Sequence, residues 1–260
     1  MSGWKALRVG VLLLVLGSVA LDAWLTRLRT TDWDAPLRVA LYPVAADRSP
    51  VTQDYVSGLT SEDFSDLGTF FAGEGGHHGL ALAEPVRITL GRTLAELPPL
   101  PPADRGLFGT VWWSLKLRWW SRGIESDAPR PRSQARVYVL YYDPATHARV
   151  SHSLGLQQGL IGIVHAFASR AQAPTNNFVI AHELLHTLGA TDKYDLATGL
   201  PQYPDGYAEP EAQPLYPQES AELMGGRIPR SDTQAEIPVS LGQVLIGKTT
   251  AREIGWISAP

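Results

Sequence analysis

The chain has 260 residues, a formal net charge of −4 and no cysteine. The lack of cysteine excludes disulfides, thiolate zinc sites and a cysteine nucleophile. The slightly acidic balance and the absence of basic runs give no electrostatic reason to expect a nucleic-acid partner. The length suits one large domain, and we expect residues 31–260 to form it in two lobes, 31–189 and 190–260.

The N-terminal segment carries a targeting pattern. Lys5 and Arg8 precede an apolar stretch at 9–21, which suits a signal-peptide core better than a membrane span of ~20 residues. Extended to 9–25, it approaches the short limit for an anchor. Residues 1–30 are therefore predicted as a cleaved signal peptide or a retained anchor, with a buried helix of a cytosolic protein as the alternative. Both favoured cases predict a secreted or membrane-anchored, extracytoplasmic protein.

Apolar alternation and turn residues predict most of the secondary structure. Strands are expected at 37–42, ending at Pro43, and at 85–90, 135–142 and 159–167. Helices are expected at 61–71, capped by Ser61, and around 250–254, with Trp256 packed on the latter. The stretch 73–79 is predicted to be a glycine-rich loop. For its paired His77 and His78 we favour a solvated loop over a metal site.

The segment 107–120 is unusually rich in tryptophan. Helical spacing would divide its large side chains between two neighbouring sides, Trp112, Leu115, Lys116 and Trp119 on one and Trp113, Leu117 and Trp120 on the other. Packing against the sheet is the favoured interpretation. A membrane-interface or ligand-stacking role is the alternative.

The stretch 182–192 reads His-Glu-Leu-Leu-His-Thr-Leu-Gly-Ala-Thr-Asp. On a helix, His182 and His186 lie on one face and can bind one metal ion, while Glu183 can reach a water on that metal as a general base. Gly189 is placed to end the helix. The chain can then turn back to supply a third ligand, for which we favour Asp192 over Asp195.

The start of this helix and one nearby histidine also carry expectations. Asn176 and Asn177 are expected to cap the helix, which would begin near Phe178. We expect His165 to be a strand side chain rather than a fourth ligand.

This run resembles the metzincin pattern H-E-x-x-H-x-x-G-x-x-(H or D), in the aspartate variant of snapalysin-like proteases. Met224, the only methionine besides Met1, matches the methionine turn that this family has beneath its metal. The resemblance implies an α+β fold: a two-lobed zinc protease domain with a mixed twisted sheet, an edge strand above the zinc helix, and a smaller, mostly irregular or helical C-terminal lobe. It also implies that the strand preceding the helix, 159–167, is the edge that pairs with an extended substrate.

The resemblance leaves one role open. Where many metzincins have a tyrosine two places after the methionine, this chain has Gly226. Four tyrosines of the proline-rich stretch 194–222, which we expect to form a wall or lid of the cleft, remain candidates to donate a hydrogen bond to an oxyanion: Tyr194, Tyr203, Tyr207 and Tyr216.

The predicted function is that of a Zn²⁺-dependent endopeptidase acting on a protein or peptide, with Glu183 as general base. One alternative is a non-catalytic metal-binding module. Another is a membrane-associated peptide-interaction module that uses the tryptophan segment. An aminopeptidase would need an acidic anchor for a free amino terminus, and the sequence identifies none. The simplest alternative is a buried helix with two hydrogen-bonded histidines.

Overall fold

The computed structural model describes residues 32–102, 106–126, 132–157 and 159–258, together with residues 4, 8, 10 and 17. The segment predicted as a signal peptide or anchor lies outside these ranges, apart from the four isolated residues. Among the described residues, no helix combines the length and the apolar composition needed to cross a membrane.

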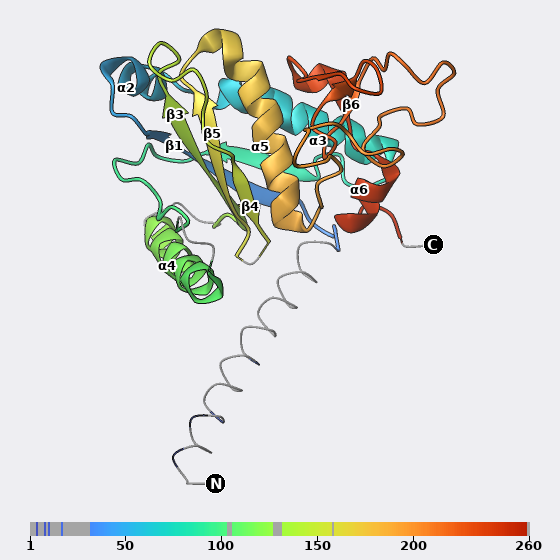
Figure 1. Ribbon diagram of the computed structural model, residues 1–260. Coiled ribbons are helices and arrows are strands. Elements are labelled where there is room, and N and C mark those ends of the chain that lie inside the picture. The colour runs from blue at the N-terminus through green and yellow to red at the C-terminus, as the bar shows by residue number, and fades with distance from the viewer. Residues whose placement is uncertain are drawn as a thin grey trace.

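The fold is mixed α/β and is built on a five-stranded mixed sheet (Figure 1). Its strands are β1 (Leu37–Ala45), β2 (Val86–Leu90), β3 (Ala135–Tyr142), β4 (Leu154–Leu156) and β5 (Ile161–Phe167). They follow the order β2-β1-β3-β5-β4, in which only β4 runs antiparallel to its neighbour. The four longer strands confirm the predicted ones. Strands β1, β3 and β5 are buried along nearly their whole length, as expected for parallel strands covered on both faces.

Strand β1 continues to Ala45, so the prediction that Pro43 ends it is wrong. Pro43 pairs with Val139 of β3 on one side. On its other side β2 has already ended, because the register with β1 stops at Leu41 and Leu90. The missing N–H of Pro43 therefore removes no ladder hydrogen bond, and its carbonyl oxygen still accepts one from the N–H of Leu94 at 2.9 Å.

Helices cover both faces of the sheet (Figure 1). The sheet-covering helices are α2 (Pro50–Ser57), α3 (Ser65–His77), α4 (Leu107–Ser126) and α5 (Ala173–Leu188), with short 3₁₀ turns at Ser61–Phe64 (η1) and Arg170–Gln172 (η2). Val39 and Leu41 of β1 point into the core shared with α2, α3 and α5. The alternate residues Ala40 and Tyr42 point into a second core under α4. The period of two along the strand thus assigns each side chain to one of two cores.

Helix α3 extends to His77, so the prediction of a loop at 73–79 is wrong for most of that stretch. Glycine disfavours helix interiors, but Gly75 is buried against Pro85, where an added Cβ would lie 3.0 Å from the proline ring. Close packing thus outweighs the low helix propensity. His78 follows the helix. Its Nε2 lies 2.7 Å from the carbonyl oxygen of Ile246, so the ring is hydrogen-bonded to the C-terminal part of the fold instead of lying in a solvated loop.

The helix begins differently from the prediction as well. Thr60, and not Ser61, caps the preceding 3₁₀ turn, in a capping box with Asp63.

Asn176 and Asn177 are not caps of α5, because that helix begins at Ala173. Asn176 instead bonds the backbone of Phe167 at the end of β5, and Asn177 donates to the carbonyl oxygen of Asp63.

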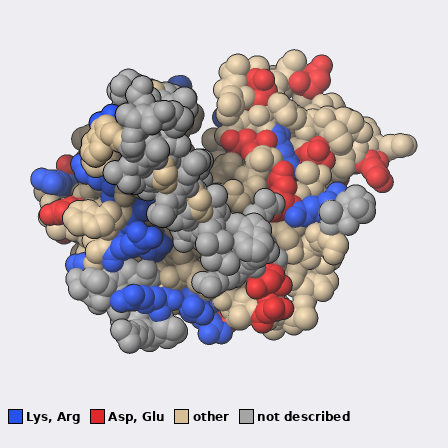
Figure 2. All heavy atoms as spheres, turned by 90° about the horizontal axis from the view of Figure 1, so that it is seen from below, with Lys and Arg blue, Asp and Glu red and all other residues tan. Residues whose placement is uncertain are grey.

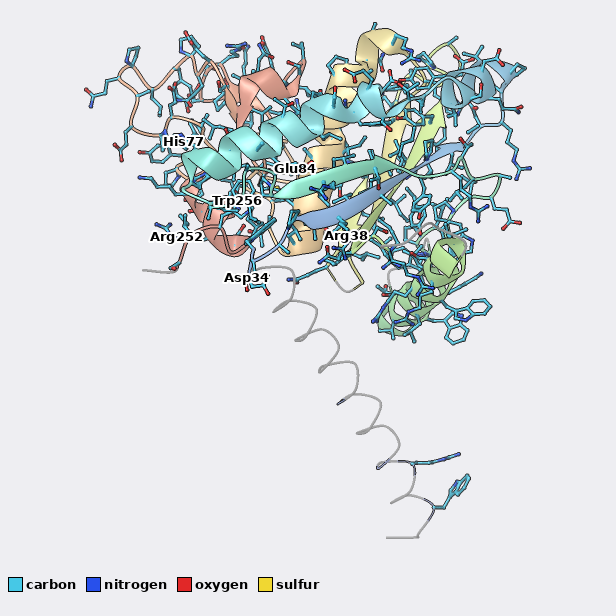
Figure 3. The ribbon with its side chains drawn as sticks, turned by 180° about the vertical axis from the view of Figure 1, so that it is seen from behind. Asp34, Arg38, His77, Glu84, Arg252 and Trp256 are labelled. Carbon is cyan, nitrogen blue, oxygen red and sulfur yellow. The ribbon has the colours of Figure 1, made fainter. Side chains whose placement is uncertain are left out.

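The C-terminal part consists of short elements that pack on the same core as α3 and α5. They are β6 (Ala221–Glu222), β7 (Ile228–Pro229), β8 (Ala235–Glu236), η3 (Leu241–Gln243), β9 (Val244–Leu245) and α6 (Lys248–Glu253). Helix α6 confirms the predicted C-terminal helix. Trp256 is buried beyond it, edge-on to Trp33 and Phe71, near the end of α3 (Figure 3).

Candidate metal centre

Helix α5 carries both histidines of the predicted site, and its end is set by Gly189. Leu184, Leu185 and Leu188 hold the helix in the core. Gly189 adopts a left-handed conformation with φ of 104°, as expected for a helix-ending glycine. The chain then reverses, which brings Asp192 back alongside the helix.

The structure brings together the three predicted ligands. Nε2 of His182 lies 3.1 Å from Nε2 of His186. Oδ1 of Asp192 lies 3.2 Å from the first nitrogen and 3.0 Å from the second. The three residues form a group able to hold a metal ion, with one ligand atom from each and all within 4.8 Å of one another.

The outer nitrogens of the two rings support a metal at this point. Nδ1 of His182 lies 2.8 Å from the carbonyl oxygen of Leu223, and Nδ1 of His186 lies 2.8 Å from that of Ala190. A carbonyl oxygen only accepts, so each Nδ1 carries the proton and each Nε2 presents a lone pair to the other ring. Two lone pairs and a carboxylate oxygen converging on one point fit a bound cation.

Charge in the site is unevenly distributed. Burial acts to raise the pKa of Asp192, but the adjacent rings of His182 and His186 outweigh burial and hold that pKa well below its usual range. Asp195, the competing third ligand, lies apart from this group. Its Oδ1 accepts hydrogen bonds from the N–H groups of Ala197 and Thr198 within its own exposed turn.

Glu183 lies next to the group without belonging to it. Its side chain is buried, and its Oε2 has no hydrogen-bond partner among the described residues. Burial raises the pKa of Glu183, while His182 and His186 act to lower it. A buried carboxylate oxygen without a partner is costly, and at this position it is free to take up a proton.

Of the four candidate tyrosines, Tyr194 lies at the site. Its ring centroid is 6.3 Å from that of His182. Burial raises its pKa to about 12, with further contributions from the charges of Asp192 and Glu183. Tyr203, Tyr207 and Tyr216 instead contact one another, with 2.7 Å between the last two hydroxyl oxygens. In the sequence, the signal that could have singled out Tyr194 is that it follows Asp192 by only two residues.

The sheet edge beside the site is β4, so the expectation that the strand 159–167 is the edge is wrong. Strand β5 is enclosed between β3 and β4. Gly155 of β4 lies directly on α5, where an added Cβ would be 2.4 Å from the carbonyl oxygen of Glu183 and 2.5 Å from Cβ of His186. Only glycine allows this strand to approach the helix so closely.

His165 is a buried side chain of β5. Its Nδ1 lies within hydrogen-bond distance of the Tyr142 hydroxyl, in keeping with its predicted strand role.

Met224 is fully buried in a turn at 223–225, and its carbonyl oxygen accepts a hydrogen bond from the N–H of Lys193. The preceding residue, Leu223, supplies the carbonyl oxygen that fixes His182. Glu222, which the sequence analysis missed, is also fully buried and accepts hydrogen bonds from the N–H groups of Gly225 and Gly247 and from the hydroxyl of Thr250. It thereby joins the methionine turn to α6.

No protein-family model matches the sequence, and the search of curated proteins found no match. Among solved structures, one similar chain is catalytically inactive OgpA from Akkermansia muciniphila in complex with an O-glycopeptide substrate, glycodrosocin. The two chains are 13% identical, and the TM-score is 0.36 over 84% of this chain and 59% of that chain. This chain therefore spans less than two thirds of the length of OgpA. The function proposed below rests on the geometry of this chain's own residues.

Proposed function

We propose that this protein is a zinc-dependent endopeptidase. The observation that supports the proposal most strongly is the convergence of two histidine Nε2 atoms and one carboxylate oxygen beside a buried, unpartnered oxygen of Glu183. Two imidazoles and one carboxylate form a ligand set typical of catalytic zinc, which keeps a further position for water or substrate. A closed structural site would instead fill four positions and would need no neighbouring base.

Each residue of the site then has a role. A bound Zn²⁺ would lower the pKa of a water molecule and polarise the substrate carbonyl. Glu183 accepts the proton of that water as the oxygen adds to the carbonyl carbon. It then delivers the proton to the amide nitrogen as the C–N bond breaks, which leaves a carboxylate and an amine. The Tyr194 hydroxyl donates a hydrogen bond to the negative charge that develops on the carbonyl oxygen.

Strand β4 is the element we propose for holding the substrate. It is an edge of the sheet, it lies on α5, and an extended peptide can add to such an edge through backbone hydrogen bonds. Backbone pairing positions an internal peptide bond whatever most of the neighbouring side chains are. This arrangement favours an endopeptidase over an aminopeptidase. For residues 1–30 we propose export out of the cytoplasm, as a signal peptide or as an anchor.

Metal analysis combined with a peptide digest tests this function. The purified full chain should contain stoichiometric zinc and should cleave casein and N-terminally acetylated peptides. Phenanthroline should abolish cleavage, and added zinc should restore it. Cleavage that survives complete removal of the metal would contradict the proposal. Cleavage restricted to peptides with a free amino terminus would identify an aminopeptidase instead.

A further inference from the structure

Helix α4 has one face that packs on the sheet. Trp113 and Leu117 are buried in the second core, and Trp120 and Ile124 pack against it. The indole N–H of Trp113 donates to the carbonyl oxygen of Pro99 at 2.7 Å. The favoured interpretation of this segment, packing against the sheet, therefore holds for this side of the helix.

The opposite face of α4 is apolar and exposed. Val111, Leu115 and Trp119 succeed one another at intervals of four residues, and Trp112 lies beside them on the helix surface. Their exposed fractions are 59%, 44%, 78% and 71%, respectively. A tryptophan side chain is rarely left so accessible without a partner, and a contiguous exposed apolar strip marks an interaction surface.

Basic residues flank this strip. Lys116 and Arg122 are exposed on α4, Arg118 is half-buried, and the sequence between residues 107 and 124 contains no aspartate or glutamate. Seen from below, most of the visible Lys and Arg side chains lie on the left, the side on which Figure 1 places α4, and most of the visible acidic side chains lie on the right (Figure 2). The surface therefore combines exposed indoles with a local positive charge.

These features fit a lipid surface better than a second copy of the chain. Indoles favour the boundary between headgroups and acyl chains, and lysine and arginine beside them attract anionic headgroups. A second copy would bring the same positive charges against Lys116 and Arg122 with no acid on the strip to offset them.

The start of the folded domain lies on the same side of the molecule as the strip. Asp34 lies three residues before the start of β1, at the lower edge of the fold, where α4 also lies (Figure 3). The apolar stretch 9–25 precedes this point in the sequence. A membrane reached by that stretch would therefore face α4. We propose that the exposed face of α4 docks on an anionic lipid bilayer and holds the domain at the membrane surface.

A single-cysteine experiment tests this docking in the full chain, which contains no native cysteine. Leu115→Cys carries a polarity-sensitive fluorophore in the strip, and Val111→Cys provides a second site. Val239→Cys is the matched control, because Val239 is 66% exposed and its carbonyl oxygen contacts Thr175 of α5, on the other face of the sheet. Each labelled protein is mixed with phosphatidylcholine vesicles that contain phosphatidylglycerol, with and without nitroxide-bearing lipid.

Emission at positions 111 and 115 should rise severalfold and shift to the blue with these vesicles, and the nitroxide should quench it. Position 239 should not respond. Lys116→Glu with Arg122→Glu should reduce the response at 115, as should pure phosphatidylcholine. The proposal is overturned if the protein does not bind vesicles, or if it sediments with them while the labels at 111 and 115 remain in water. A label shielded without lipid would assign the face to a second copy or to the chain's own N-terminal segment, and would likewise overturn it.

Discussion

Nε2 of His182 and Nε2 of His186 face each other at 3.1 Å, and Nδ1 of each ring is hydrogen-bonded to a backbone carbonyl oxygen. The protein therefore fixes the orientation of both rings from behind. Two lone pairs held this close repel each other unless a cation or a proton lies between them. The arrangement is prepared for a metal, and its stability should depend on one.

Removal of zinc should lower the stability of the fold. A ligand that binds only the folded state stabilises it by about 4 kcal/mol when its free concentration is a thousand times the Kd. We expect the melting temperature to fall on chelation and to recover with added zinc, as measured by calorimetry. His186→Ala should remove this dependence on zinc. An identical melting temperature with and without metal would show that the site holds none.

The third ligand can be identified by comparing two aspartates. Asp192→Ala should weaken zinc binding by at least about tenfold to a hundredfold, the loss typical of changing even an outer-shell partner. Asp195→Ala is the control, because its carboxylate bonds only within its own turn among the described residues. Equilibrium titration with a chelating dye measures both affinities. A larger loss for Asp195→Ala would transfer the ligand role to that residue.

The tyrosine beside the histidines should affect catalysis rather than metal binding. Tyr194→Phe removes a hydroxyl but none of the three proposed ligand atoms, so zinc supplied in excess should still fill the site and KM should stay unchanged. The loss of one donor to an oxyanion should lower kcat by about 10²- to 10³-fold. Tyr203→Phe, which alters an exposed ring in a separate cluster, should leave kcat unchanged. Equal effects of the two substitutions would remove the special role of Tyr194.

The contact between β4 and α5 predicts an intolerant glycine. Gly155→Ala places a methyl group 2.4 Å from the carbonyl oxygen of Glu183, so strand or helix must move. We expect a loss of roughly 1–3 kcal/mol in the free energy of unfolding, together with reduced peptide hydrolysis. Gly242→Ala is the control, since its Cβ would meet only the Ser240 hydroxyl oxygen at 3.5 Å. Urea unfolding of both variants measures the difference, and equal midpoints would contradict the close packing seen here.

The local part of the site could be predicted from the sequence. Residues four apart on a helix share a face whatever surrounds it, so His182 and His186 are brought together by α5 alone. Gly189 likewise ends that helix through its own conformational freedom, and its φ of 104° agrees with that expectation. The strands β1, β2, β3 and β5 could be predicted for a similar reason. Each appears in consecutive residues as an alternation of apolar and polar side chains or as a continuous apolar run.

Features that depend on tertiary contacts escaped the sequence analysis. Strand β4 has three residues, too few for a periodic signal, and it is defined by the close approach of Gly155 to α5. The glycines at the end of α3 suggest a loop until Pro85 is known to pack against Gly75. Glu222 gains its role only from donors that lie 3, 25 and 28 residues away along the chain.

The most direct test of the central claim is a paired measurement of zinc content and hydrolysis in Glu183→Gln, with the exposed Glu219→Gln as control. Glu183 is not part of the His182, His186 and Asp192 group that could hold the metal, so on the proposed function the variant should still bind zinc. Loss of the base should slow hydrolysis by about 10²- to 10⁴-fold, the usual contribution of a general acid–base group. Undiminished hydrolysis by Glu183→Gln would contradict the account.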